Sequence, residues 1–260
     1  MHTSHNFLHW LASEPLDPDL KRRFMTKSLP EVLVTGEIYV VFQPMVDLQR
    51  GGLFGHEALV RSTSWVFQSP EQLLAASLES GCCGLLGRLI RQVAVADCPN
   101  SALFLNVHPH ELEEGWLLRD DEAMYASDNP IFLELTENAP IHDLVEGRDV
   151  LRELRKRSIS LALDDLGAGY SNIRNIAELV PDVVKLDRGL VSNLAKERRM
   201  RVLVEAVVRM CNALGARVVA EGVESAEEAN ALRDCGTHFA QGYFYGRPGP
   251  NLSVMSSDNI

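Results

Sequence analysis

The chain has 260 residues, of which 46% are hydrophobic and 23% are charged, so it can bury a sizeable core and is not a disordered protein. Its formal net charge of −11 and its lack of a long basic block argue against duplex DNA or RNA as a partner, although bound divalent cations can still bring a small anion into an acidic pocket. A secretory-signal pattern, zinc-like cysteine spacing and a window of about 18 apolar residues are all missing, so we expect reduced thiols, no membrane insertion and a cytoplasmic location.

Short apolar runs typical of strands alternate with helical patterns along the chain. We predict eight strands, at residues 38–46, 54–61, 102–107, 131–135, 160–165, 183–187, 216–221 and 238–244. The first link, around residues 47–55, is too short for a crossover helix. Its QRGG sequence predicts a tight turn, so the first two strands are expected to pair antiparallel.

Helical spacing is clearest between residues 200 and 214, where apolar residues recur at i, i+3, i+4 and i+7 before Gly215. A second helix is predicted to start at Ser225, with Glu228 at the capping-box position, and to end at Gly236. Alternating strands and helices without a G-x-G-x-x-G motif favour an α/β fold of the irregular (β/α)8 TIM-barrel type over a doubly wound sheet.

The domain organisation expected from this pattern is one barrel over residues 29–250. Residues 1–28 precede the pattern and form an N-terminal extension that could pack as a helix. Residues 251–260 follow it and are expected to be a flexible tail.

Polar residues stand at the ends of nearly all the predicted strands: Glu57, Asn106, Glu134, Asp164, Asp165, Lys185, Asp187, Glu221 and Gln241. Taken singly, each has a structural explanation, such as capping a helix or forming a turn. In a barrel, however, the strand ends converge on one face and build the active site together. Carboxylates and one amide oxygen, without Cys or His, suit Mg²⁺ or Mn²⁺, and the number of carboxylates favours two ions.

The stretch LALDDLGAGY, residues 161–170, ends an apolar run in two adjacent aspartates. Buried carboxylates are costly unless they are paired or bind a cation, so bound metal is the expected partner of Asp164 and Asp165. Neighbouring residues of a strand face opposite sides, and both aspartates reach one site only if the backbone turns there. Gly167 and Gly169 make such a turn feasible.

Eight motifs in order resemble those of the EAL-domain phosphodiesterases: QPMVDL (43–48), EALVR (57–61), LNV (105–107), ELTE (134–137), DDLGAGYS (164–171), KLD (185–187), AEGVES (220–225) and QGYFYGRP (241–248). The resemblance implies a TIM-type barrel that hydrolyses the bacterial second messenger cyclic di-GMP to pGpG with Mg²⁺ or Mn²⁺. It also implies that the partners are cyclic di-GMP and a second copy of the chain, as a homodimer.

The resemblance also implies residue roles. Glu57, Asn106, Glu134 and Asp164 look like ligands of a first metal, whereas Asp165 and Glu221 would complete a second site. Lys185 resembles the residue that orients the attacking water, and Glu221 and Asp165 are further catalytic candidates. Substrate contacts are implied for Gln43, Leu59, Arg61 and Gln241, and supporting roles for Glu137, Asp187 and Glu224.

Two departures from the family pattern leave alternatives open. Leu166 and Ala168 replace the Phe and Thr that are common in the DDFGTGYS motif, in a loop that helps form the metal site. His108 follows LNV, where a small hydroxyl residue is common, and is expected to start a helix. A noncatalytic receptor for cyclic di-GMP, a protein-interaction domain, or a hydrolase of another phosphate ester are therefore the other hypotheses.

Overall fold

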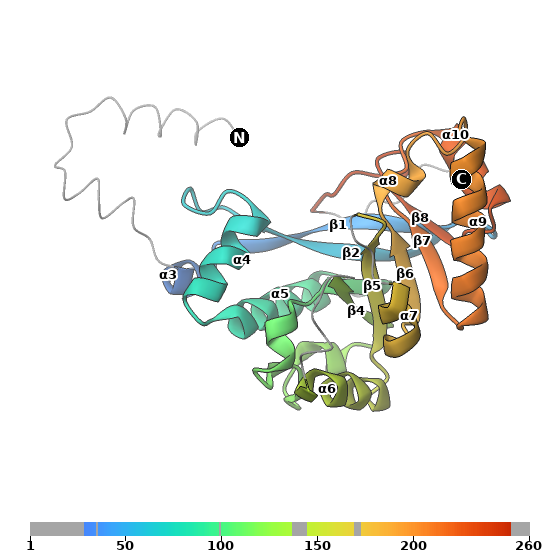
Figure 1. The fold of residues 1–260 in the computed structure, drawn as a ribbon. Helices are drawn as coiled ribbons and strands as arrows, with labels where there is room; N and C mark the ends of the chain where they lie inside the picture. Colours follow the sequence, from blue (N-terminus) through green and yellow to red (C-terminus); the bar gives the residue numbers. More distant parts are fainter. Residues whose placement is uncertain (1–28, 35, 99, 137–144, 169–172, 251–260) are drawn as a thin grey trace, which may run out of the picture.

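The computed structural model describes residues 29–34, 36–98, 100–136, 145–168 and 173–250. Eight strands form a closed barrel in the order in which they follow one another along the chain (Figure 1). They are β1 (Ile38–Asp47), β2 (Leu53–Ser62), β3 (Ala102–Asn106), β4 (Ile131–Thr136), β5 (Ser160–Leu166), β6 (Val183–Leu186), β7 (Arg217–Ala220) and β8 (Phe239–Gln241). The predicted α/β barrel is confirmed, while the expected extension and tail lie outside the described residues.

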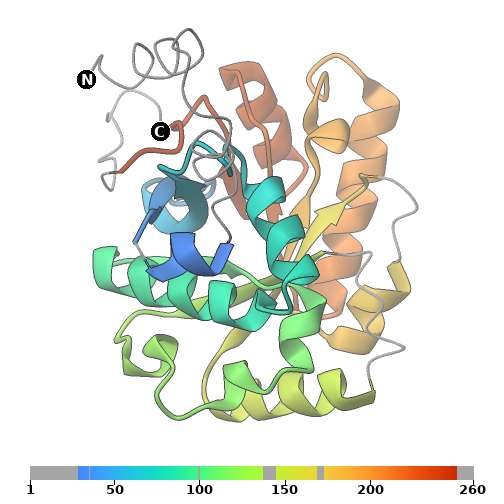
Figure 2. The same cartoon turned by 90° about the vertical axis from the view of Figure 1, so that its left-hand side faces the viewer.

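Helices surround this barrel (Figure 2). They are α3 (Leu29–Val34), α4 (Pro70–Glu79), α5 (Cys83–Asp97), α6 (Val145–Lys156), α7 (Ile173–Leu179), α8 (Arg188–Val191), α9 (Arg198–Ala213) and α10 (Ala226–Asp234). Between β3 and β4 the described chain forms three short 3₁₀ turns: η1 (Pro109–Leu112), η2 (Trp116–Leu118) and η3 (Ala123–Ala126). No helix within the described ranges has the length and apolar character needed to cross a membrane.

Strand β1 is antiparallel to both of its neighbours, β2 and β8, whereas the other adjacent pairs are parallel. The turn between β1 and β2 forms because the Asp47 carboxylate accepts the backbone N–H groups of Gln49 and Arg50, both at 2.9 Å. Gly51 and Gly52 then adopt φ angles of 72° and 92°, which glycine accommodates without strain. The antiparallel pairing predicted from the short QRGG link is confirmed.

Two predicted helices are confirmed with small shifts at their ends. Helix α9 is followed by Gly215 with φ 83°, and α10 is followed by Gly236 with φ 80°. The Ser225 hydroxyl caps α10 by accepting the backbone N–H of Glu228 at 3.2 Å. The reciprocal half of the capping box differs from the expectation, because the Glu228 carboxylate accepts the N–H of Glu224 instead.

The barrel interior is filled by an apolar layer: Met45, Ala102, Phe104, Phe132, Ala162, Val183, Val219 and Phe239. The rings of Phe104 and Phe132 stack at 4.4 Å, and those of Phe54 and Phe239 at 3.8 Å. Because side chains alternate along a strand, the residue two positions farther on faces the same side. The side chains two residues farther along each strand therefore form a second inward-facing layer above the apolar one.

Candidate active site

The second inward-facing layer is the polar ring predicted from the sequence. Two residues beyond Phe104, Phe132, Ala162, Val183, Val219 and Phe239 come Asn106, Glu134, Asp164, Lys185, Glu221 and Gln241. These residues lie at the carboxyl ends of β3 to β8, which run parallel to one another. Glu57 joins them from the middle of β2, not from its end as expected, because the β1–β2 ribbon extends beyond the barrel (Figure 1).

Lys185 lies at the centre of this ring. Its Nζ is 2.7 Å from Glu221 Oε1, 2.9 Å from Glu134 Oε1, 3.2 Å from Asp164 Oδ1 and 3.6 Å from Glu57 Oε2. The Lys185 and Glu134 side chains are fully buried. One ammonium thus faces four carboxylates, so the ring keeps an excess of negative charge that favours a further cation.

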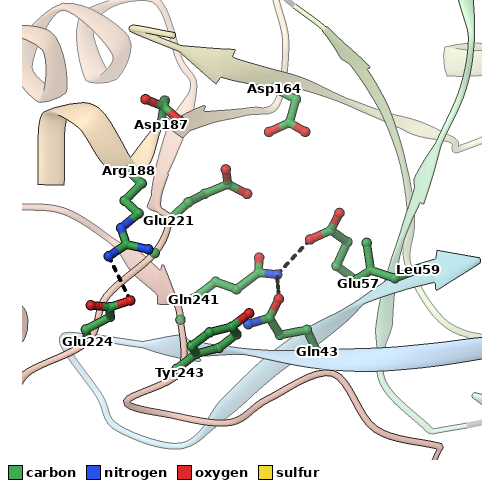
Figure 3. Close-up of a pocket in the computed structure, with 12 residues that line it drawn as sticks. Gln43, Glu57, Leu59, Asp164, Asp187, Arg188, Glu221, Glu224, Gln241 and Tyr243 are labelled. Atoms are coloured by element: carbon green, nitrogen blue, oxygen red, sulfur yellow. Dashed lines mark hydrogen bonds and ion pairs between the residues drawn. The ribbon is translucent and has the colours of Figure 1, made fainter. Parts of the chain in front are cut away.

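Amide side chains orient Glu57. Asn106 Nδ2 donates to Glu57 Oε1 at 3.1 Å, and Gln241 Nε2 donates to Glu57 Oε2 at 2.6 Å. Gln241 also donates to Gln43 Oε1 at 3.0 Å (Figure 3). Gln43 Nε2 in turn donates to the carbonyl of Gly246. This chain of hydrogen bonds gives each Glu57 oxygen an amide donor and joins β1, β2, β3 and β8 at the site.

Asp164, Asp165 and Glu221 form a second group, in which one oxygen from each carboxylate lies within 4.8 Å of the others. Both aspartates reach it because Asp165 adopts φ 60° at a register shift between β5 and β6. The turn needed for this arrangement therefore occurs at Asp165 itself, one position before Leu166 and the glycines. Gly167 has φ 109° and is held against Leu190, whereas Gly169 lies outside the described residues.

Burial and charge move the pKa values of this ring in different directions. Burial is the largest effect on Glu57 and raises its pKa, but Lys185 and the hydrogen bonds from the two amides outweigh it, so the pKa of Glu57 lies below its ordinary value. Burial raises the pKa of Glu134 well above its ordinary value and that of Glu221 to about 8. The pKa of Asp165 is raised by burial and then by the nearby Asp164 charge.

Lys185 stays protonated in this environment. Burial disfavours its charge, but the four surrounding carboxylates reverse that effect and raise its pKa well above the ordinary value. Burial is the largest cause of the raised pKa values of Glu134 and Glu221; Lys185 lowers them, and the neighbouring carboxylates raise them further. A divalent cation would remove this mismatch by favouring the ionised carboxylates.

The donor set fits such a cation. Hard oxygen ligands in a half-buried carboxylate cluster are the chemistry that Mg²⁺ and Mn²⁺ prefer. Glu134 Oε1 contacts Lys185 Nζ, whereas the buried Oε2 has no hydrogen-bond donor among the described residues, which is typical of an acceptor available to a metal ion. In the first predicted ligand group, Glu57, Glu134 and Asp164 contact Lys185, and Asn106 contacts Glu57. The second predicted group is the cluster of Asp164, Asp165 and Glu221. The structure therefore brings together the members of each group.

A pocket of about 330 Å³ opens onto the ring. Its lining residues are Gln43, Glu57, Leu59, Asp164, Asp187, Arg188, Glu221, Gly222, Glu224, Gln241, Gly242 and Tyr243 (Figure 3). Sequence reasoning had missed Arg188 and Tyr243. The signal for both was their position, directly after KLD and within QGYFYGRP.

The remaining predicted residues lie around this pocket or outside it. Arg61 is on β2, four residues beyond Glu57, and is not among the lining residues; its guanidinium donates to the carbonyl of Val60 at 2.7 Å. Asp187 caps α8 by accepting the N–H of Gly189 at 2.7 Å. Glu137 lies outside the described residues. His108 starts η1, as predicted, by accepting the N–H of His110.

Comparison with known proteins places this geometry in context. The family model described as "EAL domain" matches residues 26–248. The cyclic di-GMP phosphodiesterase RocR of Pseudomonas aeruginosa is 31% identical over 259 residues, covering 91% of this chain and 65% of RocR. The probable cyclic di-GMP phosphodiesterase PdeD of Escherichia coli is 28% identical, covering 94% of this chain and 46% of PdeD. The chain thus spans less than two thirds of these relatives.

A solved structure agrees with these matches. BlrP1 of Klebsiella pneumoniae, in its manganese and cyclic di-GMP complex at pH 9.0, superposes with a TM-score of 0.71 at 30% identity. The superposition covers 82% of this chain and 56% of BlrP1.

Proposed function

The chain belongs to the EAL domain family, and from this membership and the geometry of its site we propose that it hydrolyses cyclic di-GMP to pGpG with divalent metal. The observation that carries the proposal is the complete polar ring, in which Lys185 contacts four carboxylates from four different strands or strand ends. The choice of substrate is supported by RocR, which is named a cyclic di-GMP phosphodiesterase, and by PdeD, which is named a probable one.

The proposed cofactor is Mg²⁺ or Mn²⁺, with two ions per site. Glu57, Asn106, Glu134 and Asp164 would hold one ion, and Asp165 and Glu221, with Asp164 shared, would hold the other. When bound, such a metal pair supplies Lewis-acid activation of a water and neutralises the charge of the phosphodiester. The carboxylate cluster of Asp164, Asp165 and Glu221 and the manganese complex of BlrP1 support this assignment.

The chain's own residues orient and deprotonate the attacking water. In the proposed reaction the water oxygen bonds to phosphorus and the bond from phosphorus to the O3′ leaving group breaks. The O3′ oxygen takes up a proton from solvent, so the product carries a 5′-phosphate and a free 3′-hydroxyl. Lys185 donates to the water and directs it toward phosphorus. Glu221 or Asp165, which lie beside Asp164 in the same carboxylate cluster, accepts its proton.

Substrate binding is assigned to residues around the pocket. Gln43, Leu59 and Gln241 line it and would contact the nucleotide, with Gln241 also holding Glu57 in place. Arg61, on the same face of β2 as Glu57 and Leu59, would reach a phosphate at the pocket edge. Asp187 and Glu224 support the loops at the pocket rim, and Glu137 is proposed to do so from the resemblance.

A noncatalytic receptor for cyclic di-GMP, or a protein-interaction domain, is the second candidate. It is favoured by Leu166 and Ala168, which depart from the family pattern beside Asp164 and Asp165. Leu166 is buried and its carbonyl accepts the N–H of Asp187 at 3.0 Å, so the substitution lies between two predicted site residues. Binding without turnover would favour this candidate.

The deciding experiment is a chromatographic assay. Purified protein is incubated with cyclic di-GMP and Mg²⁺ or Mn²⁺, beside an EDTA control and the variant Glu57→Ala. We expect metal-dependent pGpG from the wild-type chain and none from the variant, because Glu57 is a proposed metal ligand and contacts Lys185, Asn106 and Gln241 in the ring. The exposed variant Glu113→Ala serves as control. Intact substrate with folded, metal-loaded wild-type protein would contradict the phosphodiesterase proposal.

We also propose a cytoplasmic protein that forms homodimers, as the family resemblance implies. The cytoplasm is where a bacterial cyclic dinucleotide messenger would be hydrolysed. Light scattering on purified protein gives the oligomeric state directly, and a mass of one chain, 28.9 kDa, at micromolar concentration would contradict the dimer.

A further inference from the structure

Arg188 lines the pocket and contacts the loop that carries Glu221. The loop follows β7 and comprises Glu221 to Ser225, which caps α10. On one side it is tied to β8, because Val223 donates to the carbonyl of Gln241 at 3.0 Å and accepts the N–H of Phe244 at 3.0 Å. Glu221 itself donates its N–H to the carbonyl of Leu186 at 3.0 Å.

Arg188 holds the opposite side of the same loop. It is the first residue of α8, directly after Asp187. A Cβ placed on Gly222 would lie 2.6 to 2.9 Å from the Cγ, Cβ and Cδ of Arg188, so the arginine stem packs directly on the Gly222 backbone. Gly222 has φ 66° and therefore supplies both the turn and the space for this contact.

The guanidinium extends this contact to the end of the loop. Arg188 Nη2 lies 2.8 Å from Glu224 Oε1 at the pocket rim (Figure 3). Both side chains are about half exposed, so the charge pair alone contributes little to stability. Together with the packing on Gly222, however, Arg188 spans the loop from its second residue to its fourth, while Glu221 stays 2.7 Å from Lys185.

We propose that Arg188 is a positioning residue, which fixes the Glu221 loop against α8 and so keeps Glu221 in the cluster with Asp164 and Asp165. The inference rests on the proposed function for its catalytic consequence. Its structural basis is independent of turnover, because the cluster geometry also governs metal binding. Residues behind metal ligands commonly have this effect on affinity.

The test compares Arg188→Ala, Arg188→Met, Arg188→Lys and Glu224→Gln with the wild-type chain. Methionine keeps an aliphatic stem on Gly222 and removes the charge, whereas alanine removes both. Arg209→Met is the matched control, because Arg209 forms an exposed ion pair with Glu205 on α9. Two readouts are needed: Mn²⁺ affinity by isothermal titration of metal-stripped protein, and kcat and KM for cyclic di-GMP.

We expect Arg188→Ala to lose about tenfold in Mn²⁺ affinity and about tenfold in kcat, with KM changed less than about twofold. Arg188→Met and Glu224→Gln should lose less, and combining those two should add nothing, because both break one contact. Arg188→Lys, which keeps the aliphatic stem and the charge, should retain most of the wild-type Mn²⁺ affinity and kcat. Arg209→Met should behave as wild type.

Two results would overturn the positioning role of Arg188, and a third would bear only on the proposed function. A raised KM in Arg188→Met, with unchanged Mn²⁺ affinity and no effect of Glu224→Gln, would make Arg188 a direct substrate contact and overturn the positioning role. Unchanged Mn²⁺ affinity and kcat in Arg188→Ala would also overturn it. Wild-type protein that binds Mn²⁺ without forming pGpG would defeat the proposed function alone, and the Mn²⁺ comparison would still decide the role of Arg188.

Discussion

At the scale of single residues, the buried positive charge of Lys185 holds the ring together. Its side chain is fully buried, and each of the four carboxylates it contacts comes from a different element of the barrel. Without this ammonium, four largely buried carboxylates would face one another with no positive charge between them. Buried charge that loses its partner is among the costliest changes a protein interior can undergo.

We predict that Lys185→Met destabilises the metal-free protein by about 3–5 kcal/mol, the range for breaking a buried ion pair by removing one partner. Urea unfolding in EDTA measures this. Added Mg²⁺ should recover part of the loss, since it supplies another positive charge to the same carboxylates. Lys156→Met, which removes an exposed partner of Glu153, is the control. A midpoint equal to that of the control variant would refute the prediction.

At the scale of elements, a buried ion network fixes the connection between β3 and β4. Arg91 of α5 donates to Glu111 of η1 at 2.6 Å and to Glu122, just before η3, at 2.9 Å. Glu111 also accepts the N–H of His108 at 3.1 Å. The irregular segment that follows Asn106 is thereby held on α5 through side chains, because its 3₁₀ turns are too short to be stable alone.

Arg91→Met is therefore expected to lower the free energy of unfolding by about 3–5 kcal/mol, since it leaves two buried carboxylates without their cation. Arg88→Met, which breaks a solvent-screened pair with Asp121, should cost much less. Denaturant unfolding of both variants checks the contrast. If the triple variant Arg91→Met, Glu111→Gln, Glu122→Gln were as unstable as Arg91→Met, unpaired charge would not be the cause.

The junction of β7 and β8 carries a titratable contact. His238 Nδ1 accepts the backbone N–H of Val218 at 3.0 Å, and protonation of that nitrogen removes the acceptor. Burial, followed by the nearby charge of Arg217, lowers the pKa of His238 from 6.5. As the pH falls below 6.5 the unfolded chain therefore takes up this proton before the folded chain does, and stability is lost.

We predict that the wild-type chain loses stability between pH 6.5 and the lower folded pKa of His238, and that His238→Gln flattens this part of the profile. Thermal unfolding from pH 5 to pH 8 measures both curves. His110→Gln, at an exposed position, should keep the wild-type slope. The same slope in His238→Gln would rule out this histidine as the cause.

For the whole molecule, the barrel joins residues from positions 43 to 241 into one site. Closure depends on β1, which pairs antiparallel with β2 and with β8 and so brings Gln43 beside Gln241. Ligands that bind only when the barrel is closed stabilise the folded state by mass action. Metal binding is thus a test of the assembled ring as well as of its chemistry.

We expect Mn²⁺ to raise the melting temperature of the wild-type chain, with a stabilisation of about 2.7 kcal/mol at 100 times the dissociation constant. EDTA should reverse the shift. The double variant Asp164→Asn, Asp165→Asn should show no Mn²⁺-dependent shift, because it removes charge from both proposed metal groups. An equal shift in that variant would place the metal elsewhere.

Local sequence signals determined the elements of this protein. The QRGG turn, the spacing of residues 200–214 and the Ser225 cap act over a few residues, so they could be predicted without knowledge of the fold. Their position at the ends of the predicted strands also identified Asn106, Glu134, Asp164, Lys185 and Gln241 as one group. This worked because the strand ends of a barrel converge on one face.

Only the tertiary structure decided how those residues interact. Asp165 adopts a left-handed backbone conformation at the site. Lys185 contacts four carboxylates, of which Glu57 lies 128 positions away in the chain, and Arg188 packs on Gly222. No local preference specifies such contacts, because they arise from barrel closure and the packing of neighbouring loops. The sequence thus determined which chemical groups surround the site, and the fold determined which of them touch, since distance in space is set by packing and not by position along the chain.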